Sequence, residues 1–237
     1  IMDKIVAIHQ PNFFPWLGYF NKIARCDCFV LLDNVQFSKK GGTYTNRVKI
    51  LIGGKDSWIT VPIKRDYHGV KYIKDIEINS DSPWQIKMMN TIKINYSKFP
   101  YYSEVINIIE NLIAQATNSL SELNINSISK LCEIWGYKQK LILGSNLECS
   151  GNSTGLLISL TKAVNGTAYM CGGGAINYQD DLEFTKAGLN LIYQKFHHPT
   201  YSQNNHENFI PGLSIIDALF CCGFSETKKL IENYEKY

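Results

Sequence analysis

Apolar residues at the start of the chain fall in short unbroken runs that end at polar residues. Residues 5–8 and 28–32 form two such runs, and the apolar side chains of residues 16–25 between them recur at helical spacing. An unbroken apolar run of this length is typical of a strand that is buried on both faces of a parallel sheet. Strand, helix and strand in this order predict a βαβ unit with a right-handed crossover.

The second half of the chain resumes this alternation of strands and helices. Strands are predicted at residues 140–143, 167–170 and 189–196. Helices are predicted at residues 154–164, 178–187, 214–220 and 225–234. The alternation predicts an α/β fold with a Rossmann-like parallel sheet that is flanked by helices.

Residues 38–138 interrupt the alternation and are predicted to form an insertion within a single α/β domain that spans residues 1–237. Two alternating stretches, 44–51 and 57–63, are separated by glycines, which is the pattern of a β-hairpin. Residues 72–78 are expected to supply another strand. Helices are predicted at residues 83–96, 102–116 and 119–135.

The overall composition fits a folded protein and narrows its class. Of the 237 residues, 45% are hydrophobic and 12% are aromatic, and the formal net charge is only +3, whereas disordered chains have few aromatics and a high net charge. The weakly basic balance does not indicate a nucleic-acid-binding protein, and no apolar run is long enough to cross a membrane. The seven cysteines follow neither the spacing of a disulfide framework nor that of a zinc site. We therefore expect a reduced, cytoplasmic protein without a metal, and the sequence leaves its oligomeric state open.

Polar residues and glycines gather directly after the predicted strands. In an open parallel sheet, ligands bind beyond the carboxyl ends of the strands. The polar residues at these strand ends therefore predict an active site at this edge of the sheet. The loops at the opposite edge carry only ordinary helix-closing residues. The residues concerned are His9 and Gln10, Asp33 and Gln36, Ser145, Cys171 with Gly172, Gly173 and Gly174, and His197 with His198.

His9 is the leading catalytic candidate because an imidazole can change charge near neutral pH and act as a general base. The alternative is that a histidine at the end of a buried strand only satisfies backbone groups. His197 and Asp33 are further catalytic candidates at the same edge of the sheet. Cys171 is expected to pack, and Asp217 to orient or cap neighbouring groups.

Several further residues are predicted to bind substrate. The glycines that follow Cys171 could direct backbone N–H groups at an anion or a carbonyl oxygen, or could only form a tight turn. Basic residues of the hairpin could hold phosphates or only form a solvated face, and aromatic residues beside polar loops could stack on a sugar or base ring. The predicted binding residues are Gln10, Asn12, Trp16, Gln36, Lys39, Tyr44, Arg47, Lys49, Ser145, Gly172, Gly173 and Gly174.

Residues 9–20, with the sequence HQPNFFPWLGYF, resemble the opening signature of the WbqC-like protein family. Residues 33–37, 58–62, 201–203 and 213–217 continue this resemblance over nearly the whole chain. The resemblance implies a role with surface-polysaccharide or O-antigen genes, in which an acyl or aminoacyl group is added to an amino sugar.

Residues 14–19 also resemble, in position, the segment where class I nucleotidylyltransferases carry their HxGH motif. Trp16 and Tyr19 stand in place of the two histidines. The resemblance therefore implies a nucleotidylyltransferase-like scaffold, without the histidines that ordinary nucleotidyl transfer needs.

The leading hypothesis from the sequence is N-acyl or aminoacyl transfer onto the amine of a nucleotide-linked deoxyamino sugar, with His9 as general base. The donor would be an acyl thioester of coenzyme A or of an acyl carrier protein. The alternatives are an ATP-dependent ligase that forms an adenylate in the same pathway, and a non-catalytic protein that binds nucleotide sugars.

Overall fold

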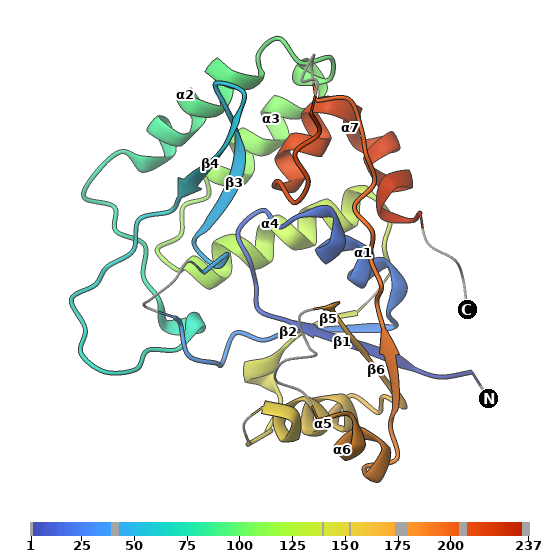
Figure 1. Ribbon diagram of the computed structural model, residues 1–237. Coiled ribbons are helices and arrows are strands. Elements are labelled where there is room, and N and C mark those ends of the chain that lie inside the picture. Colours follow the sequence, from blue (N-terminus) through green and yellow to red (C-terminus); the bar gives the residue numbers. More distant parts are fainter. Residues whose placement is uncertain are drawn as a thin grey trace.

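The computed structural model describes residues 2–38, 43–138, 140–151, 153–173, 180–203 and 208–233 (Figure 1). Its centre is a five-stranded parallel sheet with the strand order β5-β2-β1-β6-β7, which confirms the predicted Rossmann-like α/β fold. The strands are β1 (Ile5–His9), β2 (Cys28–Leu31), β5 (Lys140–Leu143), β6 (Ala168–Cys171) and β7 (Asn190–Tyr193). Along the chain, β2 and then β5 are added on one side of β1, and β6 and then β7 are added on its other side. Strand order therefore reverses between β1 and β6.

Helices cover both faces of the sheet. Figure 1 shows α1 (Leu17–Arg25) and α7 (Ile215–Ile231) on one face and α5 (Ser153–Ala163) and α6 (Asp181–Lys186) on the other. Successive strand residues point to opposite faces. Ala7 accordingly packs with the α1 and α7 cluster, and Val6 with the α5 and α6 cluster. Within the described ranges, no helix has the length and apolar character needed to span a membrane.

The chain between β2 and β5 forms the predicted insertion of a β-hairpin and helices. The hairpin pairs β3 (Arg47–Ile52) with β4 (Lys55–Thr60), and Gly53 and Gly54 form its turn with φ values of 57° and 79°, a backbone conformation that favours glycine. The helices are α2 (Trp84–Tyr96), α3 (Tyr102–Ile113) and α4 (Leu120–Ile134).

The prediction of a strand at residues 72–78 is wrong. Ile73–Asp75 form a short 3₁₀ helix, η1, and the flanking residues make isolated bridges, Gln36 with Tyr72, Ile63 with Ile78 and Glu77 with Ser119. Ile73 and Ile76, three residues apart, are both buried. That spacing places two apolar side chains on one side of a 3₁₀ turn, so the segment reaches the core without a ladder of strand pairs.

The two helices predicted at the end of the chain form the two halves of α7. Gly223 interrupts it with φ 73° and ψ 176°, a combination that is essentially confined to glycine. A Cβ at this position would lie 2.5 Å from Cδ1 of Tyr101. Glycine therefore permits both the kink and the close approach of α3.

Asp217 joins the first half of α7 to the insertion through a hydrogen bond with Tyr96. Its buried carboxylate accepts hydrogen bonds from Tyr96 Oη at 2.9 Å, Tyr201 Oη at 2.7 Å and Gln203 Nε2 at 3.1 Å. A buried carboxylate needs such donors because its desolvation is costly. Asp217 therefore orients its neighbours.

Candidate functional site

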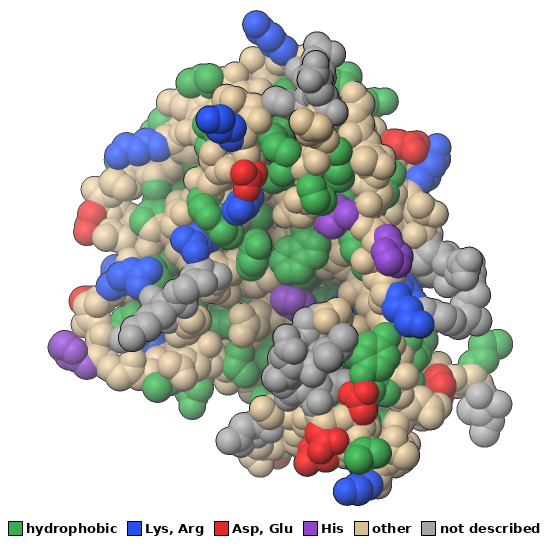
Figure 2. Space-filling view, viewed as in Figure 1, with side chains coloured by type: hydrophobic (Ala, Val, Ile, Leu, Met, Phe, Trp, Pro, Cys, Tyr) green, Lys and Arg blue, Asp and Glu red, His purple; other side chains and the backbone are tan. Residues whose placement is uncertain are grey.

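A cavity of about 990 Å³ lies at the carboxyl ends of the strands, where strand order reverses between β1 and β6. This is the position at which open α/β sheets bind ligands. In Figure 2, hydrophobic and histidine side chains gather near the centre of one face, above α5 and α6. The described residues that line the cavity are Ile8, His9, Gln10, Trp16, Gly18, Tyr19, Lys22, Leu32, Val35, Ser153, Leu156, Leu157, Tyr169, Gly172, Gly173, Gln194, Lys195, Phe196 and His197.

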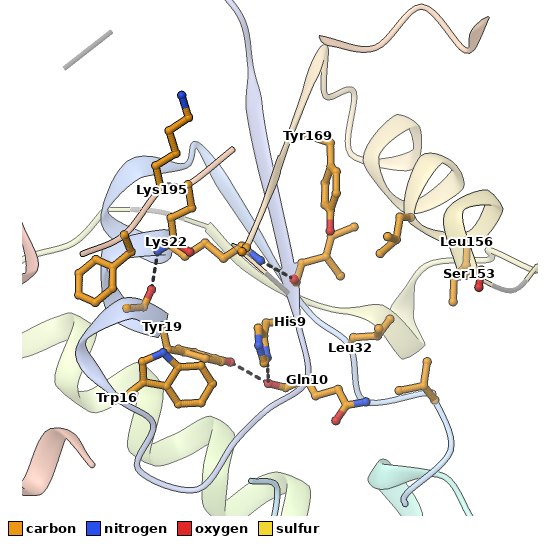
Figure 3. A pocket seen from close by; sticks show the side chains of 18 of the residues that line it. His9, Gln10, Trp16, Tyr19, Lys22, Leu32, Ser153, Leu156, Tyr169 and Lys195 are labelled. Carbon is orange, nitrogen blue, oxygen red and sulfur yellow. Dashed lines mark hydrogen bonds between the residues drawn. The ribbon is translucent and has the colours of Figure 1, made fainter. Parts of the chain in front are cut away.

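The imidazole of His9 packs against two aromatic rings, those of Trp16 and Tyr19, which lie on one side of it and also contact each other (Figure 3). Its ring centroid is 5.8 Å from that of Trp16 and 4.9 Å from that of Tyr19, both edge-on. Nδ1 of His9 is 3.1 Å from the carbonyl oxygen of Gln10, which also accepts a hydrogen bond from Tyr19 Oη at 3.0 Å. A carbonyl oxygen can only accept, so Nδ1 carries the proton and Nε2 keeps a lone pair.

The environment of His9 keeps the imidazole neutral. Burial, with a smaller contribution from the nearby charge of Lys22, lowers the pKa of His9 to about 3. At neutral pH, Nε2 therefore acts as a hydrogen-bond acceptor and a weak base.

Lys22 is a cavity residue that the sequence analysis missed. It lies on α1 with only 5% of its surface exposed, and its Nζ donates to the carbonyl oxygen of Ile8 at 3.3 Å. Burial lowers the pKa of Lys22 to about 8, against a smaller opposing effect of the Cys171 and Cys26 thiols. Lysines are almost never fully buried unless they are paired. In the sequence, the only sign of this role is that Lys22 stands in a predicted helix whose other residues are mostly apolar.

The wall of the cavity is basic. Its described residues include Lys22, Lys195, His9 and His197 but no aspartate or glutamate. Figure 3 shows the two lysines on one side and Ser153 and Leu156 on the other. A concave surface that carries one sign of charge attracts ligands of the opposite sign. The arrangement therefore suits an anionic ligand.

Six of the predicted site residues line this cavity, and two lie outside the described residues. Lys39 and Gly174 lie outside the described residues, so their binding roles remain predictions. The six that the fold brings together are His9, Gln10, Trp16, Gly172, Gly173 and His197.

Asp33 and Ser145 bind each other at the ends of β2 and β5. Oδ1 of Asp33 accepts from the Ser145 backbone N–H at 2.8 Å, and Oδ2 accepts from Ser145 Oγ at 2.6 Å. These bonds give the Asp33 carboxylate, which is 3% exposed, a role in joining the two strand ends. Asn12 is also buried and Gln36 is exposed, and none of the four is among the described cavity-lining residues.

Arg47 and Lys49 lie on β3 of the hairpin, and Tyr44 lies in the loop just before it. Together with Trp58 on β4 they form what we term the hairpin strip. The rings of Trp16 and Tyr44 are 5.3 Å apart and those of Tyr44 and Trp58 are 5.4 Å apart, so aromatic rings run from the cavity onto the hairpin. The guanidinium carbon of Arg47 lies 4.3 Å from the centre of the Trp58 ring, a cation–π contact.

The charges of the hairpin strip are only partly satisfied. Lys49 makes an ion pair with Asp56 at 2.5 Å. Nε of Arg47 is buried and has no hydrogen-bond partner among the described residues. As for metals, the described residues hold no group of three or more histidine, cysteine, aspartate or glutamate side chains that could bind an ion.

The reversed strand order, with a basic cavity at its switch point, defines a Rossmann-like α/β protein. The chain belongs to the WbqC-like protein family, whose family model matches residues 10–229. It is similar to an uncharacterized protein of Mycobacterium tuberculosis (strain ATCC 25618 / H37Rv), Rv1507c, with 27% identity over 221 residues, which cover 93% of this chain and 94% of that protein. No solved structure matches the chain.

Proposed function

We propose that the protein transfers an acyl or aminoacyl group to the amine of a nucleotide-linked deoxyamino sugar, a reaction that surface-polysaccharide biosynthesis would use. The observation that carries the proposal is the neutral His9, which presents a basic nitrogen in a cavity whose described wall has cationic side chains but no acidic ones. Such a cavity suits an anionic substrate that must lose a proton as it reacts.

His9 would serve as the proton acceptor. The sugar amine forms the new C–N bond, the C–S bond of a thioester donor breaks, and the proton released by nitrogen passes through Nε2 of His9 to the departing thiolate. A pKa of about 3 makes His9 a weak base. The nitrogen becomes acidic once it is bonded to the carbonyl carbon, and a positioned weak base suffices for this transfer.

The remaining parts of the substrates would occupy surfaces that adjoin His9. Backbone N–H groups at Gly172 and Gly173 would face the developing oxyanion. The nucleotide would lie on the hairpin strip, with its phosphates at Arg47 and its base against Trp58, because guanidinium groups suit phosphates and indole rings suit flat bases.

Mass spectrometry of nucleotide-linked amino sugars tests this reaction. The protein would be incubated with acyl thioesters and amino acids, with and without ATP. A mass gain that needs a thioester and no ATP is the expected result, and a gain that needs ATP would replace transfer by ligation. Binding without any product would indicate a non-catalytic protein that binds nucleotide sugars.

Two matched histidine variants test the role of His9. His9→Gln is expected to lower turnover by about 10²–10⁴-fold, the usual contribution of a general base. His68→Gln, on an exposed loop, is expected to leave turnover unchanged. Full turnover of His9→Gln would remove the base from the mechanism.

A further inference from the structure

We infer that Lys22 forms an anion-binding subsite inside the cavity, which holds a carboxylate or phosphate group of the ligand. This subsite is separate from the hairpin strip and does not depend on which reaction the protein performs. Its ligand is a small molecule with an anionic oxygen group that enters the cavity itself.

The ammonium group of Lys22 has donors to spare. A protonated lysine has three N–H groups, and among the described residues Nζ has one hydrogen-bond acceptor, the carbonyl oxygen of Ile8 at 3.3 Å. Only 5% of the residue is exposed, so water has little access to the ammonium group. A buried charge is costly unless it is paired and hydrogen-bonded. A bound anion would supply both the opposite charge and further hydrogen-bond acceptors.

Among the described residues that face Lys22, none is an aspartate or glutamate that could neutralise this charge. The titratable groups that face Lys22 are His9 on β1, Cys171 on β6 and Cys26 after α1. His9 is neutral because its pKa is about 3, and burial raises the pKa of the Cys26 thiol, which is therefore also neutral. Sγ of Cys171 donates to the carbonyl oxygen of Ile192 at 3.5 Å, so this group is a protonated thiol. The described residues of the cavity wall include no carboxylate that could take the place of a ligand.

The end of β6 leaves room for the anion. A Cβ at Gly172 would lie 3.9 Å from Nζ of Lys22 and 3.8 Å from Oε1 of Gln194, so the missing side chain keeps the space in front of the ammonium open. Gln194 is held in place, because its Nε2 donates to the carbonyl oxygen of Gly18 at 2.6 Å and to Oδ1 of Asn21 at 2.9 Å. Gln194 is therefore positioned beside the ammonium group before any ligand binds.

An NMR titration of the unmodified protein tests the subsite. Lysines labelled with ¹³C at Cε would be titrated with base in sodium chloride, in sodium sulfate and in sodium acetate at equal ionic strength. Sulfate stands for a phosphate group and keeps its charge through the titration, and acetate stands for a carboxylate. We expect Lys22 to titrate near 8 in chloride and at least one pH unit higher with the anion that fits, because a bound anion favours the charged amine.

The response of Lys22 to the two anions identifies the ligand class. A larger shift with sulfate assigns the subsite to a phosphate, and a larger shift with acetate assigns it to a carboxylate. Lys130 on α4, which is exposed and paired with Glu133, is the internal control and should not respond. The same Lys22 titration curve in all three salts would overturn the subsite.

Two variants of Lys22 and one control variant add a second readout. Lys22→Met should lose the binding of the effective anion at least tenfold, whereas Lys22→Arg should retain it and make it independent of pH between 7 and 10, because a guanidinium stays charged. Lys130→Met should bind as the unmodified protein does. Unchanged anion binding by Lys22→Met would also contradict the inference. Since these measurements involve no turnover, their failure would leave the proposed acyl transfer untouched.

Discussion

At the scale of single residues, the cavity holds two side chains whose burial opposes their charged forms. Burial lowers the pKa of His9 to about 3 and that of Lys22 to about 8. Perturbed titratable groups of this kind cluster at functional sites. Each group weakens the fold in the pH range where its charged form would otherwise be stable, which suggests that both are kept for their chemistry.

Lys22→Met should stabilise the protein at neutral pH. The pKa of Lys22 is about 8 in the folded protein and 10.5 ordinarily, so the unfolded chain binds more protons between these values. The folded state therefore loses stability as pH falls from 10.5 towards 8. The full loss, on the order of 3 kcal/mol, is present at pH 7, and the variant should recover much of it.

Urea unfolding at pH 7 and pH 10 checks this prediction. The variant should have the higher unfolding midpoint at pH 7, and its advantage should shrink at pH 10. A variant that is less stable than the natural protein at pH 7 would instead mark Lys22 as a structural residue.

At the scale of elements, the buried strands and their helices could be predicted from the sequence, whereas their irregular neighbours could not. β1, α1 and β2 follow from unbroken apolar runs and helical spacing, since these patterns report burial directly. The strand predicted at residues 72–78 is wrong because Ile76 and Ile78 have the two-residue period of a strand, whereas Ile73 and Ile76 have the three-residue period of a 3₁₀ turn. Only the surrounding packing decides between the two.

Gly223→Ala tests the kink that lets α7 pack against α3. A Cβ at this position would meet the Tyr101 ring at 2.5 Å, and φ is 73°, so we expect a loss of about 3 kcal/mol in the free energy of unfolding. Gly69→Ala is the matched control, because Gly69 has φ 76° with open space around it, and should lose only about 1 kcal/mol. Equal losses in the two variants would show that the contact with Tyr101 contributes nothing.

At the scale of the whole molecule, the sheet supplies the cavity and the insertion supplies the hairpin strip. The sequence predicted which residues follow the strands, so it found His9, Gln10 and Gly172. It could not show that Asp33 turns away to bind Ser145, or that Lys22 points into the cavity. Both facts depend on how distant segments pack, which no local pattern records.

The hairpin strip and the cavity should affect catalysis differently if they bind different parts of one substrate. Trp58→Ala is expected to raise KM for a nucleotide-linked amino sugar about tenfold, because it removes a stacking surface worth roughly 1–3 kcal/mol, with little change in kcat. Trp58→Phe, which keeps a ring, should behave nearly as the natural protein. A fall in kcat with an unchanged KM would place the nucleotide elsewhere.

The central claim is that a nucleotide-linked amino sugar binds across the cavity and the hairpin strip together. The indole N–H signals of the four tryptophans report on this directly. During a titration with such sugars, Trp16 and Trp58 should shift together, while the buried Trp84 and Trp135 should stay in place. Signals of Trp16 and Trp58 that remain unmoved by a sugar known to bind would contradict the account.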